Sequence, residues 1–447
     1  MPVSGCEIRL CGHLALNVIM PRNVGDFEVH WTDASTNDVW EVSLTTDYAD
    51  VRAYVKGGNG VTAAGPDPSW MAFLSTEWMA AVGAESQVQF QVRGVSSANP
   101  TAVGSAAPQI VKLSNETLNG GIYYWASAGT EPEGIYRHDM SLPGQPAQQY
   151  MTKAQTNGRC VACHVLSRDG KNMAITYDGG NGNATMVDVA SATPQVLGAP
   201  QAWNFGTFTP DGAQFLSVHG GALVVRDYAT QNVLASMTSA GWVTHPDLSP
   251  DGTGLVYVRP NAGAISADWS FGGGQIIART YDQATHTFGA ERTLVADANN
   301  NYYPSWSPDG QWILYNQSID DTKSGAYNNP SATLWVVKAD GSSPPIQLAK
   351  LNSSVANLTN SWGRWAPFAQ SLGANSEVMY WVTVSSKRTF GVRLVAGNQP
   401  QIWMAPFFPD RAGAAGDPSE VAFRLPFQNI TSNNHIAQWT EQVVGIQ

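Results

Sequence analysis

The sequence has few charged residues, few cysteines and no long apolar run, and each shortage removes a class of protein. Only 13% of the 447 residues are charged, the formal net charge is −11, and Lys and Arg form no cluster, so no nucleic-acid-binding surface is expected. No segment comes near ~18 uninterrupted apolar residues, so no transmembrane helix is predicted. The G-x-S-x-G pattern of serine hydrolases is also missing, which argues against hydrolase chemistry.

The N-terminal segment MPVSGCEIRLCGH, residues 1–13, contains no apolar core of a signal peptide. Its four residues VSGC resemble the end of a bacterial lipoprotein signal, whose cysteine, here Cys6, carries a lipid anchor. A disulfide between Cys6 and Cys11 is the alternative, because an export compartment permits it. Together with the weakly charged, acidic composition, these features predict an exported protein in the bacterial periplasm or at the cell surface.

Glycine (43), proline (26) and tryptophan (16) are abundant, which is typical of short strands joined by many turns and predicts an all-β protein. Four segments align without gaps on an Asp-Gly pair: CVACHVLSRDGKNMAITYD, AWNFGTFTPDGAQFLSVHG, GWVTHPDLSPDGTGLVYVR and NNYYPSWSPDGQWILYNQS. Asp-Gly forms a tight turn between strands. A large apolar residue stands three positions before each of these aspartates: Leu166, Phe208, Leu248 and Trp306. The pattern indicates an internal repeat.

Two further segments, NSWGRWAPF and NNHIAQW, fit the repeat without the Asp-Gly pair. The intervals of about 40–60 residues leave room for four short strands each, as in the blades of a β-propeller. Residues 121–140 have outer strands only, whereas the C-terminal HIAQWTEQVV has an inner strand only. We therefore predict a six-bladed β-propeller over residues 109–447, with one blade closed by both ends of this segment.

The turns YYPSWSPDG, TFTPDG and DLSPDG, together with VSSKRTFG, resemble the six-bladed propeller of the TolB-like family, over roughly residues 115–447. The resemblance implies a fold and says little about function, because propellers host many activities.

Residues 1–108, with a tail at 1–15, lack the repeat and alternate apolar and polar residues in segments such as VWEVSLTT and SQVQFQVRGV. They resemble a fibronectin type III or immunoglobulin-like β-sandwich. We expect a core filled by Trp31, Trp40, Trp70 and Trp78, and a linker at residues 96–108.

Cys160, Cys163 and His164 spell C-x-x-C-H, the spacing that attaches a c-type haem. Two thiols at this interval form thioethers with the two haem vinyl groups, and the adjacent histidine coordinates the iron. The motif predicts one covalent haem c, held through Cys160 and Cys163.

The repeat predicts that this motif lies at the mouth of the central channel, where each blade contributes one residue to a ring. The six ring positions are Cys163, Phe205, His245, Tyr303, Trp362 and Ile436. We expect Phe205, Tyr303 and Trp362 to form an aromatic wall around the haem. Iron would be coordinated by His164 and His245, with His435 as the second choice for the latter. Arg364 would pair with a haem propionate, because guanidinium binds carboxylates in a bidentate manner.

Other interpretations of the motif stay open. Cys160 and Cys163 would form a disulfide in an oxidising compartment, or would bind zinc together with His164 and His245. For the whole chain, the first hypothesis is an exported monohaem cytochrome that passes electrons to a redox partner protein. A haem enzyme acting on peroxide or nitrogen oxides, and a haem-free TolB-like protein-binding propeller, are the alternatives.

Overall fold

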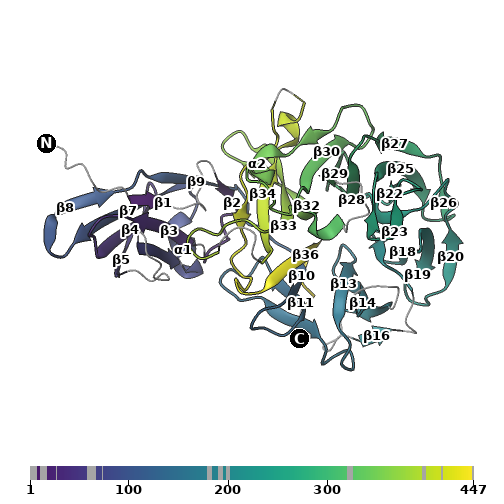
Figure 1. The fold of residues 1–447 in the computed structure, drawn as a ribbon, viewed down its shortest axis with the longest axis horizontal. Coiled ribbons are helices and arrows are strands. Elements are labelled where there is room, and N and C mark those ends of the chain that lie inside the picture. The colour runs from purple at the N-terminus through teal and green to yellow at the C-terminus, as the bar shows by residue number, and fades with distance from the viewer. Residues whose placement is uncertain are drawn as a thin grey trace.

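The computed structural model of the chain describes residues 8–10, 18–26, 28–57, 67–72, 74–178, 184–189, 195–197, 202–319, 326–394, 399–413 and 416–444. Its elements are almost all strands, arranged as an N-terminal β-sandwich beside a ring of blades (Figure 1). The predicted all-β class, with a sandwich followed by a propeller, is confirmed. No helix in the described ranges is both long and apolar enough to cross a membrane. Cys6 and Cys11, with the predicted lipid anchor or disulfide, lie outside the described residues.

The sandwich consists of two sheets and one helix. The smaller sheet has the order β1 (Ile8–Leu10), β3 (Glu28–Asp33), β6 (Asp67–Ala72). The larger has the order β2 (Ile19–Met20), β9 (Gln109–Leu113), β7 (Gln87–Ser96), β4 (Val39–Thr45), β5 (Asp50–Lys56), with β8 (Asn99–Ser105) paired to β7. Helix α1 (Ser75–Val82) lies between β6 and β7 in the chain. Alternation along β7 buries one face of the larger sheet, so Trp31, Trp40 and Trp78 are fully buried in the core.

The predicted linker at residues 96–108 is wrong. Strand β8 forms a hairpin with β7 in which Arg93 lies opposite Ser105. Strand β9 then pairs with both β7 and β2. The sandwich therefore extends to Leu113, beyond the predicted boundary at residue 108.

The propeller has six blades, each a sheet of four main strands. Blade 1 contains β13 (Val161–Leu166), β14 (Asn172–Tyr177), β15 (Ala184–Asp188) and β16 (Gln195–Leu197), and blade 2 contains β17 (Phe205–Phe208), β18 (Gln214–His219), β19 (Ala222–Asp227) and β20 (Val233–Ser236). Blade 3 contains β21 (Thr244–Leu248), β22 (Gly254–Arg259), β25 (Gln275–Asp282) and β27 (Arg292–Val295), with β26 (Thr287–Phe288) on β25 and a hairpin of β23 (Ile265–Ala267) and β24 (Ser270–Phe271).

Blade 4 contains β28 (Asn300–Trp306), β29 (Trp312–Ser318), β30 (Thr333–Lys338) and β31 (Ile346–Gln347), and blade 5 contains β32 (Ser361–Leu372), β33 (Glu377–Ser386), β34 (Gln401–Phe407) and β35 (Phe423–Arg424). Blade 6 joins β36 (Asn433–Thr440) to β10 (Gly121–Ser127), β11 (Gly134–Asp139) and β12 (Gln148–Thr152). The short helices η1 (Ala326–Asn328), α2 (Ala349–Asn352) and η2 (Pro409–Arg411) lie in connections of blades 4 and 5.

Both ends of the propeller segment meet in blade 6, as predicted. Strand β36 pairs antiparallel with β10, for example Trp439 with Ile122. Each inner strand also contacts the next one around the ring, including β36 with β13 on one side and with β32 on the other. Closure hides the inner edges of the sheets, which would otherwise be free to pair with other chains.

The Asp-Gly turns form as the repeat predicts, and all lie at one end of the channel. In blade 3, the Ser249 hydroxyl donates to Asp251, and Asp251 accepts from the Thr253 amide. These bonds hold the pKa of Asp251 below its usual value. Gly252 follows with φ of 74°, a left-handed conformation that favours glycine.

The sandwich packs directly against the propeller. One apolar core cluster joins Trp31 and Trp40 of the sandwich to Trp381 and Met404 of blade 5. At the edge of this contact His30 accepts a hydrogen bond from the Val392 amide, with 3.0 Å between the two nitrogens, and its ring meets that of Phe390 edge-on. The two domains therefore share buried surface.

Gly391 is the tightest point of this contact, because a Cβ built there would lie 1.7 Å from His30 Nδ1. We expect Gly391→Ala to displace the sandwich, so that limited proteolysis cuts between the domains at lower protease concentration than in the wild type. Gly373→Ala is the matched control: Gly373 also has a left-handed φ, of 70°, but nothing lies within 4 Å of its built Cβ. Equal cleavage of the two variants would contradict the prediction, since both pay the same backbone strain of about 1–2 kcal/mol.

Candidate functional site

The ring at the channel mouth is built by a β-bulge repeated in successive blades. The pairing of inner and second strands shifts register between Thr244 and Asp247, between Tyr302 and Ser305, and between Ser361 and Arg364. The ring residues at these bulges have left-handed backbones, with φ of 49° at His245, 51° at Tyr303 and 59° at Trp362, and Ile436 of blade 6 has a φ of 58°. This conformation is costly for residues other than glycine, so its repetition indicates a position fixed by the fold.

The aromatic side chains of the ring fill the channel. Ring centroids lie 4.1 Å apart for Phe205 and His245, 4.4 Å for His245 and Tyr303, and 4.5 Å for Tyr303 and Trp362. Phe205 of blade 2 also reaches Trp362 of blade 5, at 6.4 Å. The predicted aromatic residues are thus brought together, but as a packed plug, and not as a wall around open space. A planar cofactor has no room between them.

The C-x-x-C-H segment enters the channel at the end opposite the Asp-Gly turns. Cys160 lies just before β13, and its thiol hydrogen-bonds to Glu133 in the connection between β10 and β11. Burial, followed by this contact with a carboxylate, raises the pKa of Cys160 to about 11. Cys163 occupies the ring position of blade 1, and burial raises the pKa of its thiol as well. Both cysteines are free thiols in the structure.

His164 and His435 come from neighbouring blades and lie close enough to interact. Both are buried, with exposed fractions of 1% and 4%. Burial, with the adjacent His164 as a second cause, lowers the pKa of His435 to about 3, so His435 is neutral at pH 7. Its ring stacks on Trp125 at 4.8 Å and meets Tyr327 edge-on at 4.7 Å. Within the described chain, neither ring nitrogen of His435 has a hydrogen-bond partner.

His245 is positioned differently. Its Nδ1 accepts a hydrogen bond from the Tyr303 amide at 3.3 Å, and burial lowers its pKa well below the usual value, with Arg364 as a second cause. A neutral imidazole with one nitrogen accepting carries its proton on the other. Nε2 of His245 is then an N–H group without a lone pair for a metal. This geometry disfavours His245 as an iron ligand and leaves His435 as the better-placed histidine.

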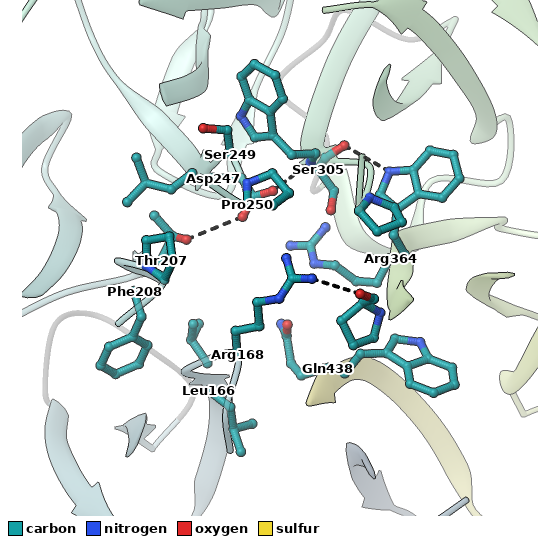
Figure 2. Close-up of a pocket in the computed structure, with 18 of the residues that line it drawn as sticks. Leu166, Arg168, Thr207, Phe208, Asp247, Ser249, Pro250, Ser305, Arg364 and Gln438 are labelled. Carbon is teal, nitrogen blue, oxygen red and sulfur yellow. Dashed lines mark hydrogen bonds between the residues drawn. The ribbon is translucent and has the colours of Figure 1, made fainter. Parts of the chain in front are cut away.

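Arg364 lies beyond the plug, in a cavity of about 150 Å³ at the Asp-Gly end of the channel (Figure 2). Its guanidinium stacks over Trp362 at 4.6 Å and donates to the Gly363 carbonyl at 2.9 Å. Figure 2 shows the side chain pointing into this cavity, toward Asp247, with the Arg168 side chain between it and Gln438. Because the plug separates Arg364 from Cys160, the geometry does not favour a contact between Arg364 and a haem propionate.

The structure lends no support to a zinc site. Over the ranges that are described, no three or more His, Cys, Asp or Glu side chains gather closely enough to hold a metal ion.

Sequence reasoning missed Trp125, Glu133 and Tyr327. Trp125 lies directly opposite His435 in the pairing of β10 with β36, so the predicted closure of blade 6 contained the signal for it. Glu133 and Tyr327 lie in connections between strands, where the repeat gives no register.

Fold and site define the class of protein: a six-bladed β-propeller with an attached β-sandwich and a Cys-x-x-Cys-His segment on an inner strand. No family model matches the chain, and no curated protein is similar to it in sequence.

Among solved structures, it is similar to TolB from Acinetobacter baumannii, with 13% identity, 79% of each chain covered and a TM-score of 0.47. It is also similar to putative TolB from Agrobacterium tumefaciens, with 16% identity, 72% of this chain and 99% of that chain covered, and a TM-score of 0.39. Hydrazine synthase from Kuenenia stuttgartiensis gives 12% identity, coverage of 68% and 74%, and a TM-score of 0.36. Structural similarity at these TM-scores says nothing about function.

Proposed function

We propose that this protein is an exported monohaem c-type cytochrome that transfers electrons to a redox partner protein. Cys160 and Cys163 would hold the haem through thioether bonds, and His164 and His435 would coordinate its iron. The observation that carries the proposal is the environment of His435, whose two ring nitrogens are buried and lack hydrogen-bond partners in the described chain. A buried polar group without a partner is costly, and coordination to a metal would satisfy one of these nitrogens.

The chemistry of the other residues fits this role. A bound haem supplies one-electron redox chemistry. Burial keeps His435 neutral, as an iron ligand must be, and the parallel ring of Trp125 fixes its orientation. Both thiols are protonated and free, the state in which an S–H group adds across a vinyl double bond. The packed plug of Phe205, Tyr303 and Trp362 would exclude water from the Asp-Gly side of the channel.

Expression with and without a c-haem maturation system tests the proposal. We expect haem that stays attached after denaturation, detected by haem staining and by the mass of the denatured chain. The variant Cys160→Ser/Cys163→Ser should lose all of it. The matched control, Cys6→Ser/Cys11→Ser, changes two cysteines of the same chain outside the motif and should retain it.

A wild-type chain without covalent haem would contradict the proposal and would favour a haem-free binding propeller. Covalent haem with a high-spin spectrum that changes on addition of peroxide or nitric oxide would contradict the electron-transfer role and indicate a haem enzyme.

A further inference from the structure

The cavity at the Asp-Gly end of the channel has the composition of a binding site. Each of the six blades contributes at least one polar side chain to its lining, among them Arg168, Thr207, Asp247, Ser305, Arg364 and Gln438. Its volume is about 150 Å³, and it is partly open to solvent.

Two of these side chains have hydrogen-bonding capacity that the described chain does not use. Arg364 donates from one terminal nitrogen to its neighbour's carbonyl, and its other N–H groups have no acceptor among the described residues. The Gln438 amide likewise makes no hydrogen bond within the described ranges, although it points into the cavity (Figure 2). Both side chains are partly exposed within the cavity, and free donors of this kind favour a carboxylate ligand.

The negative charge of the cavity belongs to Asp247. Its carboxylate accepts from the Trp306 amide at 2.8 Å and from the Thr207 hydroxyl at 3.3 Å, which leaves further lone pairs free. Burial raises the pKa of Asp247 and lowers the pKa of Arg364, and the attraction between the two groups opposes both shifts, although they do not form an ion pair. The cavity therefore holds a separated cation and anion, each with unused capacity.

Arg168 adds no uncompensated charge to the cavity. It pairs with Glu441 at 2.5 Å and donates to the Pro367 carbonyl at 2.8 Å, so its charge is compensated within the protein. A simple anion would leave the site with an uncompensated negative charge, and a simple cation would leave it with a positive one. A ligand with both charges preserves neutrality.

We propose that this cavity binds a small zwitterion of the α-amino acid class, with its carboxylate on Arg364 and its ammonium group on Asp247. Gln438 and Ser305 lie where they would contact the ligand from the adjoining blades. Glycine and alanine are the smallest members of this class. The site is separate from Cys160 and His164, so the inference does not depend on haem.

Titration calorimetry of the full chain tests the proposal with four compounds: glycine, L-alanine, acetate and methylammonium. We expect glycine or L-alanine to bind at least tenfold more tightly than acetate or methylammonium, which each carry only one of the two charges. The wild-type comparison needs no variant that risks misfolding. Failure of both amino acids to bind at millimolar concentration, or acetate binding as tightly as glycine, would overturn the proposal.

Variants then test which side chain binds each charged group of the ligand. Arg364→Gln should abolish amino-acid binding, whereas Arg52→Gln, a change at a half-exposed arginine of the sandwich, should leave it unchanged. Asp247→Asn keeps an acceptor for the Trp306 amide but removes the charge. It should weaken glycine binding at least tenfold and strengthen acetate binding. Unchanged affinities in Asp247→Asn would contradict the assigned orientation.

Discussion

Haem-loaded His435→Ala should lose the low-spin absorption spectrum expected of the wild type, whereas His245→Ala should keep it. The reason is the difference between the two imidazoles. His435 offers two unpartnered ring nitrogens beside His164, whereas His245 already accepts from the Tyr303 amide. Loss of the sixth ligand leaves an open position and a high-spin iron. Absorption and magnetic circular dichroism spectra of the purified, haem-loaded proteins measure the change.

His219→Ala is the matched control for this comparison, because His219 is exposed at the end of β18. Retention of a low-spin spectrum in His435→Ala, combined with its loss in His245→Ala, would reverse the assignment. Covalent haem content separates a ligand effect from a folding failure, since attachment depends on Cys160 and Cys163 and not on His435.

Trp381→Ala should be among the most destabilising substitutions in the chain. Trp381 is fully buried in the cluster that joins sandwich and propeller, and its indole N–H donates to Gln370 at 2.7 Å. Truncating a buried tryptophan costs about 3–5 kcal/mol, and the unpaired Gln370 amide adds to this. The midpoint of urea unfolding, followed by circular dichroism, should fall accordingly.

Trp269→Ala serves as the control, because Trp269 is 36% exposed. Its expected effect on the unfolding free energy is below 1 kcal/mol, as at most surface positions. A comparable loss of unfolding free energy in both variants would show that the shared cluster does not stabilise the protein as expected.

The repeat made most of the propeller predictable from sequence. Each Asp-Gly pair fixes a turn, so counting backwards from Asp251 or Asp309 places the ring residues without knowledge of the fold. Closure of the ring followed from two incomplete blades, and β36 does pair with β10. Local turn chemistry and strand period carry this information.

The wrong predictions concern residues whose burial leaves no periodic pattern in the sequence. Strand β8 is exposed along most of its length, so its sequence needs no alternation of apolar residues and resembles that of a linker. Within the site, the ring positions were predictable but their packing was not. Whether Phe205 and Trp362 line a space or fill it depends on the bulges and their left-handed backbones, which no residue spacing encodes.

The pairing of β36 with β10 also has a temporal consequence. His164 lies in the first third of the propeller segment, whereas His435 belongs to the last strand of the propeller and is synthesised later. With haem attached as proposed, the two axial positions would be filled at different stages of maturation. The second ligand would arrive only when the ring closes, so the spin state of the iron would report whether an individual molecule has completed its fold.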